Sequence, residues 1–188
     1  MRYPKEHKDQ TRRRVVEVAA ARFRREGLDK VGVASLMSEA GLTHGGFYSH
    51  FDSKEALIEE VFASGMEENF RRLAEASEQG GIEGLINRYL RAGVREHPER
   101  SCPAGALGSE IHRHSKGART AFARKLERTV AKIRELLPVT NKDRAEAIFA
   151  VLVGTIQLAR AVPDLAQSDR LLESGKAAAL ALAREPGQ

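Results

Sequence analysis

Apolar residues recur every three or four positions through most of the chain, which is the spacing of an amphipathic α-helix. The first set comprises Val15, Val18, Ala19 and Phe23. Asp9 or Thr11 is a suitable N-cap for this helix, and Gly27 is the expected stop after Glu26. The long alternation of Val, Ile and Thr that is typical of strands is missing. The pattern therefore predicts an all-α fold.

Residues 32–51 have the pattern of two short helices joined by a tight turn. The apolar set of the first helix is Val33, Leu36, Met37 and Ala40. Gly41 then suits a left-handed turn, Leu42 supplies a core residue, and the hydroxyl of Thr43 is a candidate N-cap for the next helix. That third helix is marked by Phe47, Tyr48 and Phe51. Three short helices with this turn predict a helix-turn-helix over residues 32–51.

The remainder of the chain is also predicted to be helical, which gives about nine helices in total. Asp52 or Ser53 caps a fourth helix, and Asp52 has capping-box spacing to Glu55. This helix is expected to continue through Phe70 and to break at Gly80-Gly81. Further helices are expected over 82–95, 110–114, 118–137, 143–162 (with Asn141 as its cap) and 168–183. We expect a helix-turn-helix domain over 9–69 and a helical domain over 70–188.

The charge distribution favours an anionic partner without proving one. The formal net charge is +5 and the sequence pI is about 9.6. Residues 1–57 hold 11 Lys and Arg against 8 Asp and Glu, whereas residues 58–188 hold 20 against 18. The positive excess is therefore denser near the N-terminus.

Several features predict a cytoplasmic protein that does not span a membrane. Cys102 is the single cysteine, so an intramolecular disulfide is impossible and a reducing compartment is favoured. The first twenty residues carry charges throughout and lack the apolar region of a secretory signal. The longest apolar stretch, Ala147–Ala159, is interrupted by Thr155 and Gln157 and is shorter than the roughly 18–20 residues of a membrane span.

The segment from Gly41 to Leu57 resembles the DNA-binding domain of TetR-family regulators. It reads Gly-Leu-Thr-His-Gly-Gly-Phe-Tyr-Ser-His-Phe-Asp-Ser-Lys-Glu-Ala-Leu, and its tyrosine, His-Phe pair and Ser-Lys-Glu match the family pattern almost position by position. The resemblance covers about residues 8–62. The rest of the chain resembles the family in being helical, of suitable length and apolar near its end.

The resemblance implies a homodimeric repressor that binds a palindromic operator in double-stranded DNA and is released by a small-molecule effector. It implies no cofactor. The chain departs from the family pattern at the start of the second helix, where Val33 stands in place of a threonine that can touch a phosphate. Ser35 or Lys30 is a possible substitute for that contact.

The DNA-contacting residues are expected on and around the third helix, whose N-terminal end should enter the major groove. His44 is the best candidate for reading a base edge, and Gly45 and Gly46 allow close approach of the backbone. Tyr48 and His50 are phosphate candidates by the resemblance. Lys54 opposes the helix dipole in its first turn, which a bound phosphate would explain. The predicted set is Thr43, His44, Gly45, Gly46, Tyr48, Ser49, His50, Lys54, Ser35 and, from the basic run at 12–14, Arg12.

Residues 143–162 are apolar around almost the whole helix, which indicates burial on all sides. With the last helix, they predict a four-helix dimer interface; an intrachain core is the alternative. The predicted interface residues are Ile148, Phe149, Leu152, Ile156, Leu172 and Leu180.

An effector pocket is the least constrained site, because its candidate residues also suit a plain core. They are Phe62, Met66, Phe70, Tyr89, Cys102, Leu107, Ile111, Phe122 and Leu126. Cys102 lies near Arg100, and a nearby cation lowers a thiol pKa, so a redox- or electrophile-sensing regulator is an alternative function. His112 and His114 would diverge on a helix, and we expect no metal site.

Two other classes of protein are less compatible with the sequence. An enzyme would need a nucleophile with its base, a phosphate-binding loop or a metal cluster, and the sequence shows none of these patterns. A non-specific architectural DNA binder would need a denser basic surface than a net charge of +5 with 26 acidic residues.

Overall fold

The computed structural model describes residues 5–65 and 67–184, and all regular structure in these two ranges is helical. The α-helices are α1 (Lys5–Glu26), α2 (Val33–Glu39), α3 (Lys54–Ala63), α4 (Glu67–Tyr89), α5 (Ala92–Glu96), α6 (Pro103–Leu107), α7 (Lys116–Leu136), α8 (Ala145–Ala161) and α9 (Leu165–Ala183). Four 3-10 helices lie between them, namely η1 (His44–Ser49), η2 (Pro98–Arg100), η3 (Ile111–Arg113) and η4 (Val139–Arg144). The all-α prediction is thus confirmed for the described residues. Among them, no helix combines the length and the apolarity that crossing a membrane requires.

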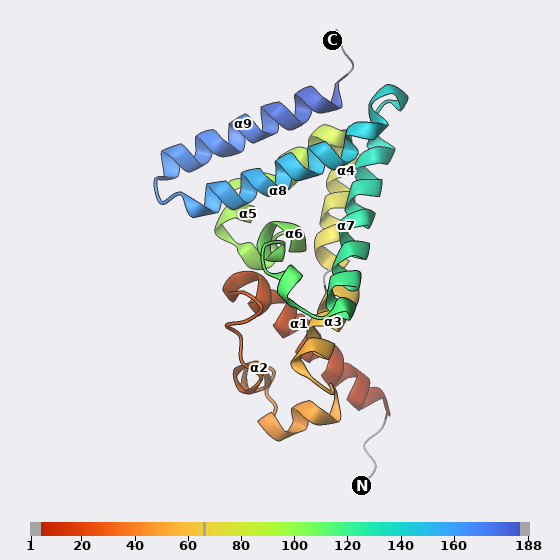
Figure 1. The fold of residues 1–188 in the computed structure, drawn as a ribbon, viewed down its shortest axis with the longest axis vertical. Helices are drawn as coiled ribbons and strands as arrows, with labels where there is room; N and C mark the ends of the chain where they lie inside the picture. Colours follow the sequence, from red (N-terminus) through yellow and green to blue (C-terminus); the bar gives the residue numbers. More distant parts are fainter. Residues whose placement is uncertain (1–4, 66, 185–188) are drawn as a thin grey trace.

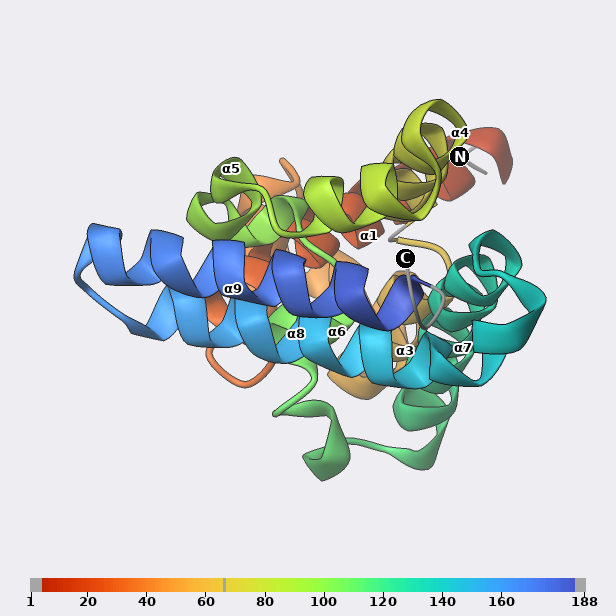
Figure 2. The ribbon, with the colours of Figure 1, turned by 90° about the horizontal axis from the view of Figure 1, so that it is seen from above.

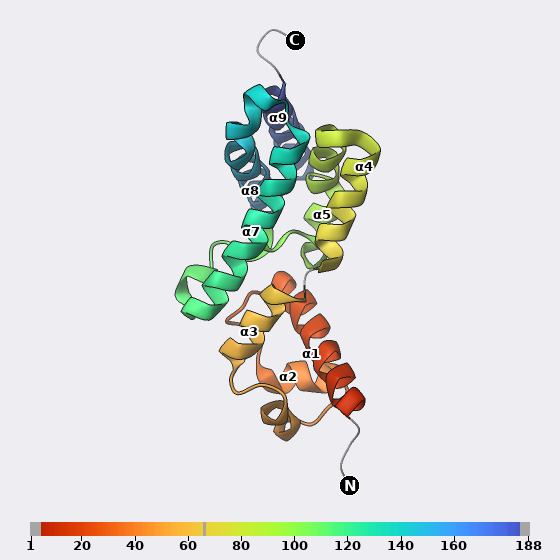
Figure 3. The ribbon, with the colours of Figure 1, turned by 90° about the vertical axis from the view of Figure 1, so that its right-hand side faces the viewer.

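The helices form two groups that are stacked end to end (Figures 1 and 3). The head, residues 5–63, contains α1, α2, η1 and α3. The body, residues 67–184, contains the other helices. Each group has its own cluster of buried apolar side chains, but η3 and the first half of α7 contribute to the cluster of the head. The ring of Phe62 in α3 meets the ring of Phe122 in α7 edge to face, with 5.4 Å between centroids.

The turn between α2 and η1 has the geometry that the sequence predicts. Gly41 adopts φ +72°, in the left-handed region that strongly favours glycine. Its backbone N–H donates to the carbonyl of Ser38, and the N–H of Leu42 donates to the carbonyl of Met37 at 2.8 Å. These two bonds satisfy carbonyls at the end of α2 in a Schellman motif, so the turn is fixed by the backbone. Gly27, which ends α1, has φ +94° and confirms the other predicted stop.

Ser53 is confirmed as an N-cap, whereas Asp9 and Thr11 are not caps because both lie inside α1. Ser53 caps α3, because its hydroxyl accepts a hydrogen bond from the backbone N–H of Ala56. The capping box with Glu55 is wrong, since that carboxylate binds His114 and Ser115 of the body instead. Thr43 precedes η1 in an extended conformation, but its hydroxyl makes no capping bond. A 3-10 helix of six residues with two glycines replaces the predicted α-helix there.

Asn141 is not a helix cap, because it lies buried inside η4. Its side-chain amide donates to the carbonyls of Ala183 and Arg184, at 3.2 and 2.6 Å. These carbonyls belong to the end of α9 and have no partner within the helix. Asn141 therefore ties the C-terminal end of α9 to the start of α8.

The predicted continuous helix through Phe70 is wrong, because α3 ends at Ala63 and α4 begins at Glu67. A Cβ atom at Gly65 would lie 2.9 Å from Cγ1 of Val16, so only glycine lets the chain pass this close to α1. The predicted break at Gly80-Gly81 is confirmed, since both residues leave helical geometry within α4.

The helices α8 and α9 lie side by side and antiparallel on one outer face of the body (Figure 2). The predicted interface residues Ile148, Phe149, Leu152, Ile156 and Leu172 are all buried within the chain itself, and Leu180 is half-buried. Their assignment to a dimer interface is therefore corrected to the intrachain core. The outward faces of the two helices carry other residues.

Replacing Phe62 with Ala should destabilise the whole protein, because the ring is fully buried between the head and α7. Phe→Ala in a core typically costs about 3–5 kcal/mol of unfolding free energy. The matched control is Tyr48→Ala, since the Tyr48 side chain is 64% exposed and its loss should cost less than about 0.5 kcal/mol. Urea unfolding followed by circular dichroism measures both, and equal midpoints for the two variants would contradict the packing described.

Candidate nucleic-acid interface

The surface around η1 presents the predicted reading residues at the end of the head farthest from the body (Figures 1 and 3). Phe47 is buried and its ring stacks on Phe51 at 5.4 Å, which anchors η1 from below. His44 and Tyr48 lie on the outer side, with their rings 6.3 Å apart. Tyr48 is 64% exposed, so its phenol is accessible to a partner, as a phosphate contact would require.

The two glycines of η1 differ in what surrounds them. A Cβ atom at Gly45 would meet nothing within 4 Å, whereas one at Gly46 would lie 3.6 Å from the hydroxyl of Thr43. Neither glycine has a positive φ. Backbone strain therefore does not require glycine at position 45, and a ligand that comes close to the backbone would explain it. Ser49 is exposed, and its hydroxyl donates to the carbonyl of Gly46 at 2.7 Å.

His50 is half-buried, and its Nδ1 has no hydrogen-bond partner among the described residues. Burial lowers the pKa of His50, and the cations Lys8 and Arg12 lower it further. The imidazole is therefore neutral at physiological pH. A charged contact from His50 to a phosphate would have to overcome this shift.

Arg12 binds inside the head, which is a correction to its predicted role as a phosphate contact. Its Nε donates to Glu60 Oε1 at 3.0 Å, and its other nitrogens bind the second Glu60 oxygen and the carbonyl of His50. The guanidinium also stacks on the ring of Phe51, 4.4 Å from the centroid. Arg12 thus joins α1 to α3 and to the end of η1. No local pattern in the sequence announces these partners, because they are 38 and 48 residues away.

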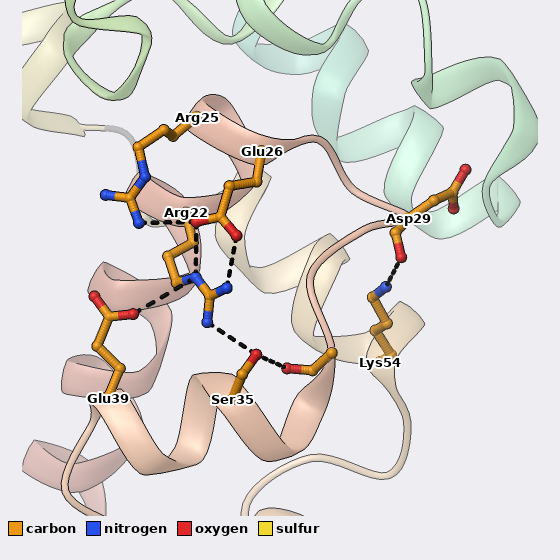
Figure 4. A network of polar contacts seen from close by, with 8 residues as sticks. Arg22, Arg25, Glu26, Asp29, Ser35, Glu39 and Lys54 are labelled. Atoms are coloured by element: carbon orange, nitrogen blue, oxygen red, sulfur yellow. Dashed lines mark hydrogen bonds and ion pairs between the residues drawn. The ribbon is translucent and has the colours of Figure 1, made fainter.

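Ser35 and Lys54 also bind within the head (Figure 4). The hydroxyl of Ser35 accepts from Arg22 Nη1 at 2.9 Å and donates to the carbonyl of Gly32. Arg22 in turn pairs with Glu26 and Glu39. Lys54 Nζ donates to the carbonyl of Asp29 at 3.2 Å. Phosphate contacts from Ser35 and Lys54 remain predictions, and each would have to replace a bond seen here.

Arg13 and Arg14 are exposed, and Arg14 lies beside the turn. The guanidinium of Arg14 lies 3.5 Å from the position that a Cβ atom of Gly41 would take. Arg14 therefore lies next to the turn that precedes η1, at a place where a nucleic-acid backbone would meet a positive charge. The run of arginines at 12–14 indicated a basic surface here. The sequence did not show that Arg12 binds inside the head while Arg13 and Arg14 are exposed.

A hollow of the body with a volume of about 600 Å³ lies between α6, α7 and α8. Its lining is mainly apolar and includes Phe122, Leu126, Val130, Phe149 and Val153, with Gln157 and Glu146 as polar groups. Phe122 and Leu126 were predicted as pocket residues. Phe149 was predicted for the dimer interface instead. Its helix is apolar around almost its whole circumference, so the sequence did not show which side Phe149 faces.

The other predicted pocket residues are divided among three places. Phe70 and Cys102, with Phe122 and Leu126, line a recess of about 20 Å³, which is room for about one water molecule. Phe62, Leu107 and Ile111 belong to the core of the head, and Tyr89 to that of the body, so the assignment of these four to one effector pocket is corrected. Met66 lies outside the described residues.

Cys102 is buried, which changes the chemistry expected from its neighbourhood. Burial raises the pKa of the thiol, and this outweighs the lowering by hydrogen bonds from Tyr89 and backbone groups and by the charge of Arg24. The expected activation by Arg100 is therefore wrong. A protonated, enclosed thiol is a poor nucleophile.

In the head, α2, the turn at Gly41 and the exposed η1 follow one another. This arrangement is a helix-turn-helix, and a helical body follows it. Residues 15–61 match the family described as bacterial regulatory proteins of the tetR family. This match covers 47 of the 188 residues, all of them in the head, so the head is similar to the regulatory proteins of that family.

Curated relatives match less than half of the chain. An uncharacterized HTH-type transcriptional regulator of Bacillus subtilis (strain 168), YfiR, is 30% identical over 86 residues, 46% of this chain and 42% of the relative. The HTH-type regulator TtgR of Pseudomonas putida is 33% identical over 78 residues, and the HTH-type repressor KstR2 of Rhodococcus jostii is 30% identical over 69. These alignments span 37% and 34% of the two relatives, so less than half of each relative's length is matched.

Solved structures share the fold over the whole chain. Reduced NemR of E. coli superposes with a TM-score of 0.77 at 18% identity and covers 95% of this chain and 100% of its own. A TetR-family regulator of Cytophaga hutchinsonii gives 0.73 at 21% identity, with 96% and 98% covered. At these identities the likeness shows the fold alone.

Replacing Arg12 with Met should lower the unfolding free energy by about 1 kcal/mol, because a partly exposed ion pair and a hydrogen bond are lost. Glu60→Gln should lower it similarly, and the double variant should cost less than the sum of the two. Arg13→Met, at an exposed neighbour, is the control and should be neutral. Urea unfolding measures these values; an additive cycle would show that Arg12 and Glu60 do not interact.

Proposed function

We propose that the chain is a sequence-specific DNA-binding transcriptional regulator that acts as a homodimeric repressor. The observation that carries the proposal is the exposed surface of His44, Gly45 and Tyr48 on a rigid turn, in a segment that matches the tetR family. Phosphate contacts supply most of the affinity of such proteins, and base contacts supply the specificity. Footprinting on the DNA upstream of the protein's own gene tests it. Protection of one short palindrome is expected, and uniform binding to any duplex would contradict specific recognition.

The second copy is proposed to pack on the outer face of α8 and α9. Outward positions on α8 carry small or apolar side chains, namely Ala147, Ala150, Leu158 and Ala161. Leu158 is 57% exposed, which leaves apolar area for a partner to cover. A two-fold arrangement would place two heads on the two half-sites of a palindrome.

The effector is proposed to bind in the hollow between α6, α7 and α8. Its volume of about 600 Å³ falls in the range of small-molecule pockets, and its lining has the usual apolar walls with few polar groups. Glu146 is already paired with Arg134, so its charge is compensated. These features support an apolar, uncharged effector of moderate size.

Replacing Gly45 with Ala should weaken operator binding about tenfold, equivalent to about 1.4 kcal/mol, without lowering stability. The added methyl group meets no protein atom and its backbone needs no positive φ, so only the approach to DNA is affected. Gly80→Ala is the matched control, because its Cβ is also in open space but lies in the body. Fluorescence anisotropy with a labelled operator measures the affinity, and unchanged binding by the Gly45 variant would refute backbone approach at η1.

Replacing Leu158 with Glu should dissociate the proposed dimer, because it buries a charge at an apolar contact. The dimer dissociation constant should rise at least tenfold in sedimentation equilibrium. Val139→Glu is the control, since Val139 is 83% exposed on η4 and should leave the dimer intact. Dimers of equal affinity in both variants would show that the α8–α9 face is not the contact.

A further inference from the structure

The short helix η2 lies in the part of the body that faces the head, where it contacts α1, α4 and α5. Arg24 of α1 donates from Nε to the carbonyl of Glu99, at 2.7 Å. Asn69 of α4 donates from its amide to the carbonyl of Arg100, at 2.9 Å. Arg72 lies one turn after Asn69, on the same side of α4. These two hydrogen bonds therefore bring arginines of three elements to one place.

Five arginines gather there, and we call them the arginine cluster: Arg24, Arg72, Arg88, Arg91 and Arg100. Arg88 lies near the end of α4, and Arg91 is the residue before α5, which packs on η2. Arg88 is half-buried, whereas Arg91 and Arg100 are exposed. The charges of Arg72, Arg91 and Arg100 all act on Arg88.

The acidic groups at this place are too few to balance the cluster. Arg72 binds Glu68 at 2.8 Å, and Glu68 also binds Arg71. Glu99 lies 4.0 Å from Arg100 and is shared with His97. Within residues 5–65 and 67–184, no carboxylate is among the groups that act on Arg88.

Part of the cluster is also cut off from water. Nη1 of Arg24 is buried and has no hydrogen-bond partner among the described residues. Burial lowers the pKa of Arg24 to about 10, and Arg72 contributes to this lowering. Burial also lowers the pKa of Arg88, with Arg91, Arg72 and Arg100 as further causes. The charge of Glu99 offsets part of the lowering at Arg24, whereas every cause that acts on Arg88 lowers its pKa, so a bound anion would relieve both groups.

We propose that the arginine cluster is a binding site for a small oxyanion that carries at least two negative charges, such as a phosphate ester or a polycarboxylate. Planar guanidinium groups bind carboxylate and phosphate oxygens in pairs, with charge-assisted hydrogen bonds. Several of them around one point select multiply charged anions over chloride. Nη1 of Arg24 supplies a donor that no group within residues 5–65 and 67–184 uses.

This site is separate from both sites proposed above. None of the five arginines lines the hollow between α6, α7 and α8. Arg24 lies twelve residues after Arg12 on α1, which is about 18 Å along a helix, and so far from the reading surface. The inference therefore does not depend on DNA binding or on an apolar effector.

The test is titration of the full-length protein with sodium pyrophosphate and, in parallel, with citrate at constant ionic strength, by calorimetry. One site per chain is expected, with a rise in the thermal unfolding midpoint. Arg88→Met and Arg91→Met should each weaken binding at least tenfold, since each removes a charge-assisted contact. Arg91 is exposed, so its variant keeps the test valid if Arg88→Met fails to fold.

Arg13→Met is the matched control, because it removes one exposed arginine from the head. Its affinity for either anion should equal that of the unmodified protein. Binding of pyrophosphate alone would identify a phosphate ligand, and binding of citrate alone a polycarboxylate. The proposal is overturned if neither anion binds, if the Arg91 and Arg88 variants bind as tightly as the unmodified protein, or if only Arg13→Met loses binding.

Discussion

The packing of α3 against α7 is the contact on which the arrangement of head and body depends. Apolar burial supplies its centre, with Phe62 and Phe122 in edge-to-face contact. Ala118 and Ala121 of α7 are buried in the same apolar cluster as Leu57, Ile58 and Phe62 of α3. The head is thus held by shape complementarity at one helix pair.

Polar groups at the edge of this contact fix its orientation. Glu55 accepts from the backbone N–H of Ser115 at 2.9 Å and from Nδ1 of His114 at 2.9 Å. Burial alone would raise the pKa of Glu55, but the hydrogen bonds from His114 and Ser115 outweigh it, and the pKa is lowered. On the other side, Glu110 accepts from the backbone N–H of Leu28, directly after the turn at Gly27. Two carboxylates thus cross between head and body in opposite directions.

This joint explains which features the sequence predicted and which it did not. The helical class and the turns at Gly27 and Gly41 follow from local spacing and from the conformational preference of glycine, and these predictions were confirmed. The capping box of Glu55 and the free guanidinium of Arg12 were also local expectations, but distant groups compete for both side chains. A charged side chain binds whichever partner the tertiary fold brings near, and a single sequence does not state that partner.

The same limit applies to the body. The sequence of α8 does not distinguish apolar residues of the intrachain core from those of a dimer face. Ile148 and Leu152 were therefore predicted for the dimer interface, although both are buried within the chain. Side-chain direction is set by how α8 packs on α5, α6, α7 and α9, which depends on long-range contacts. Leu158 is distinguished from these residues only by its exposure in the folded chain.

The position of Phe122 connects the hollow of the body to the head. Its ring forms part of the lining between α6, α7 and α8, and the same ring contacts Phe62 of α3. If the hollow binds the effector, as proposed, the effector would contact Phe122, whose ring is in contact with Phe62 of the head. Such a contact alters DNA binding only if the ligand favours one of two arrangements of α7 against α3.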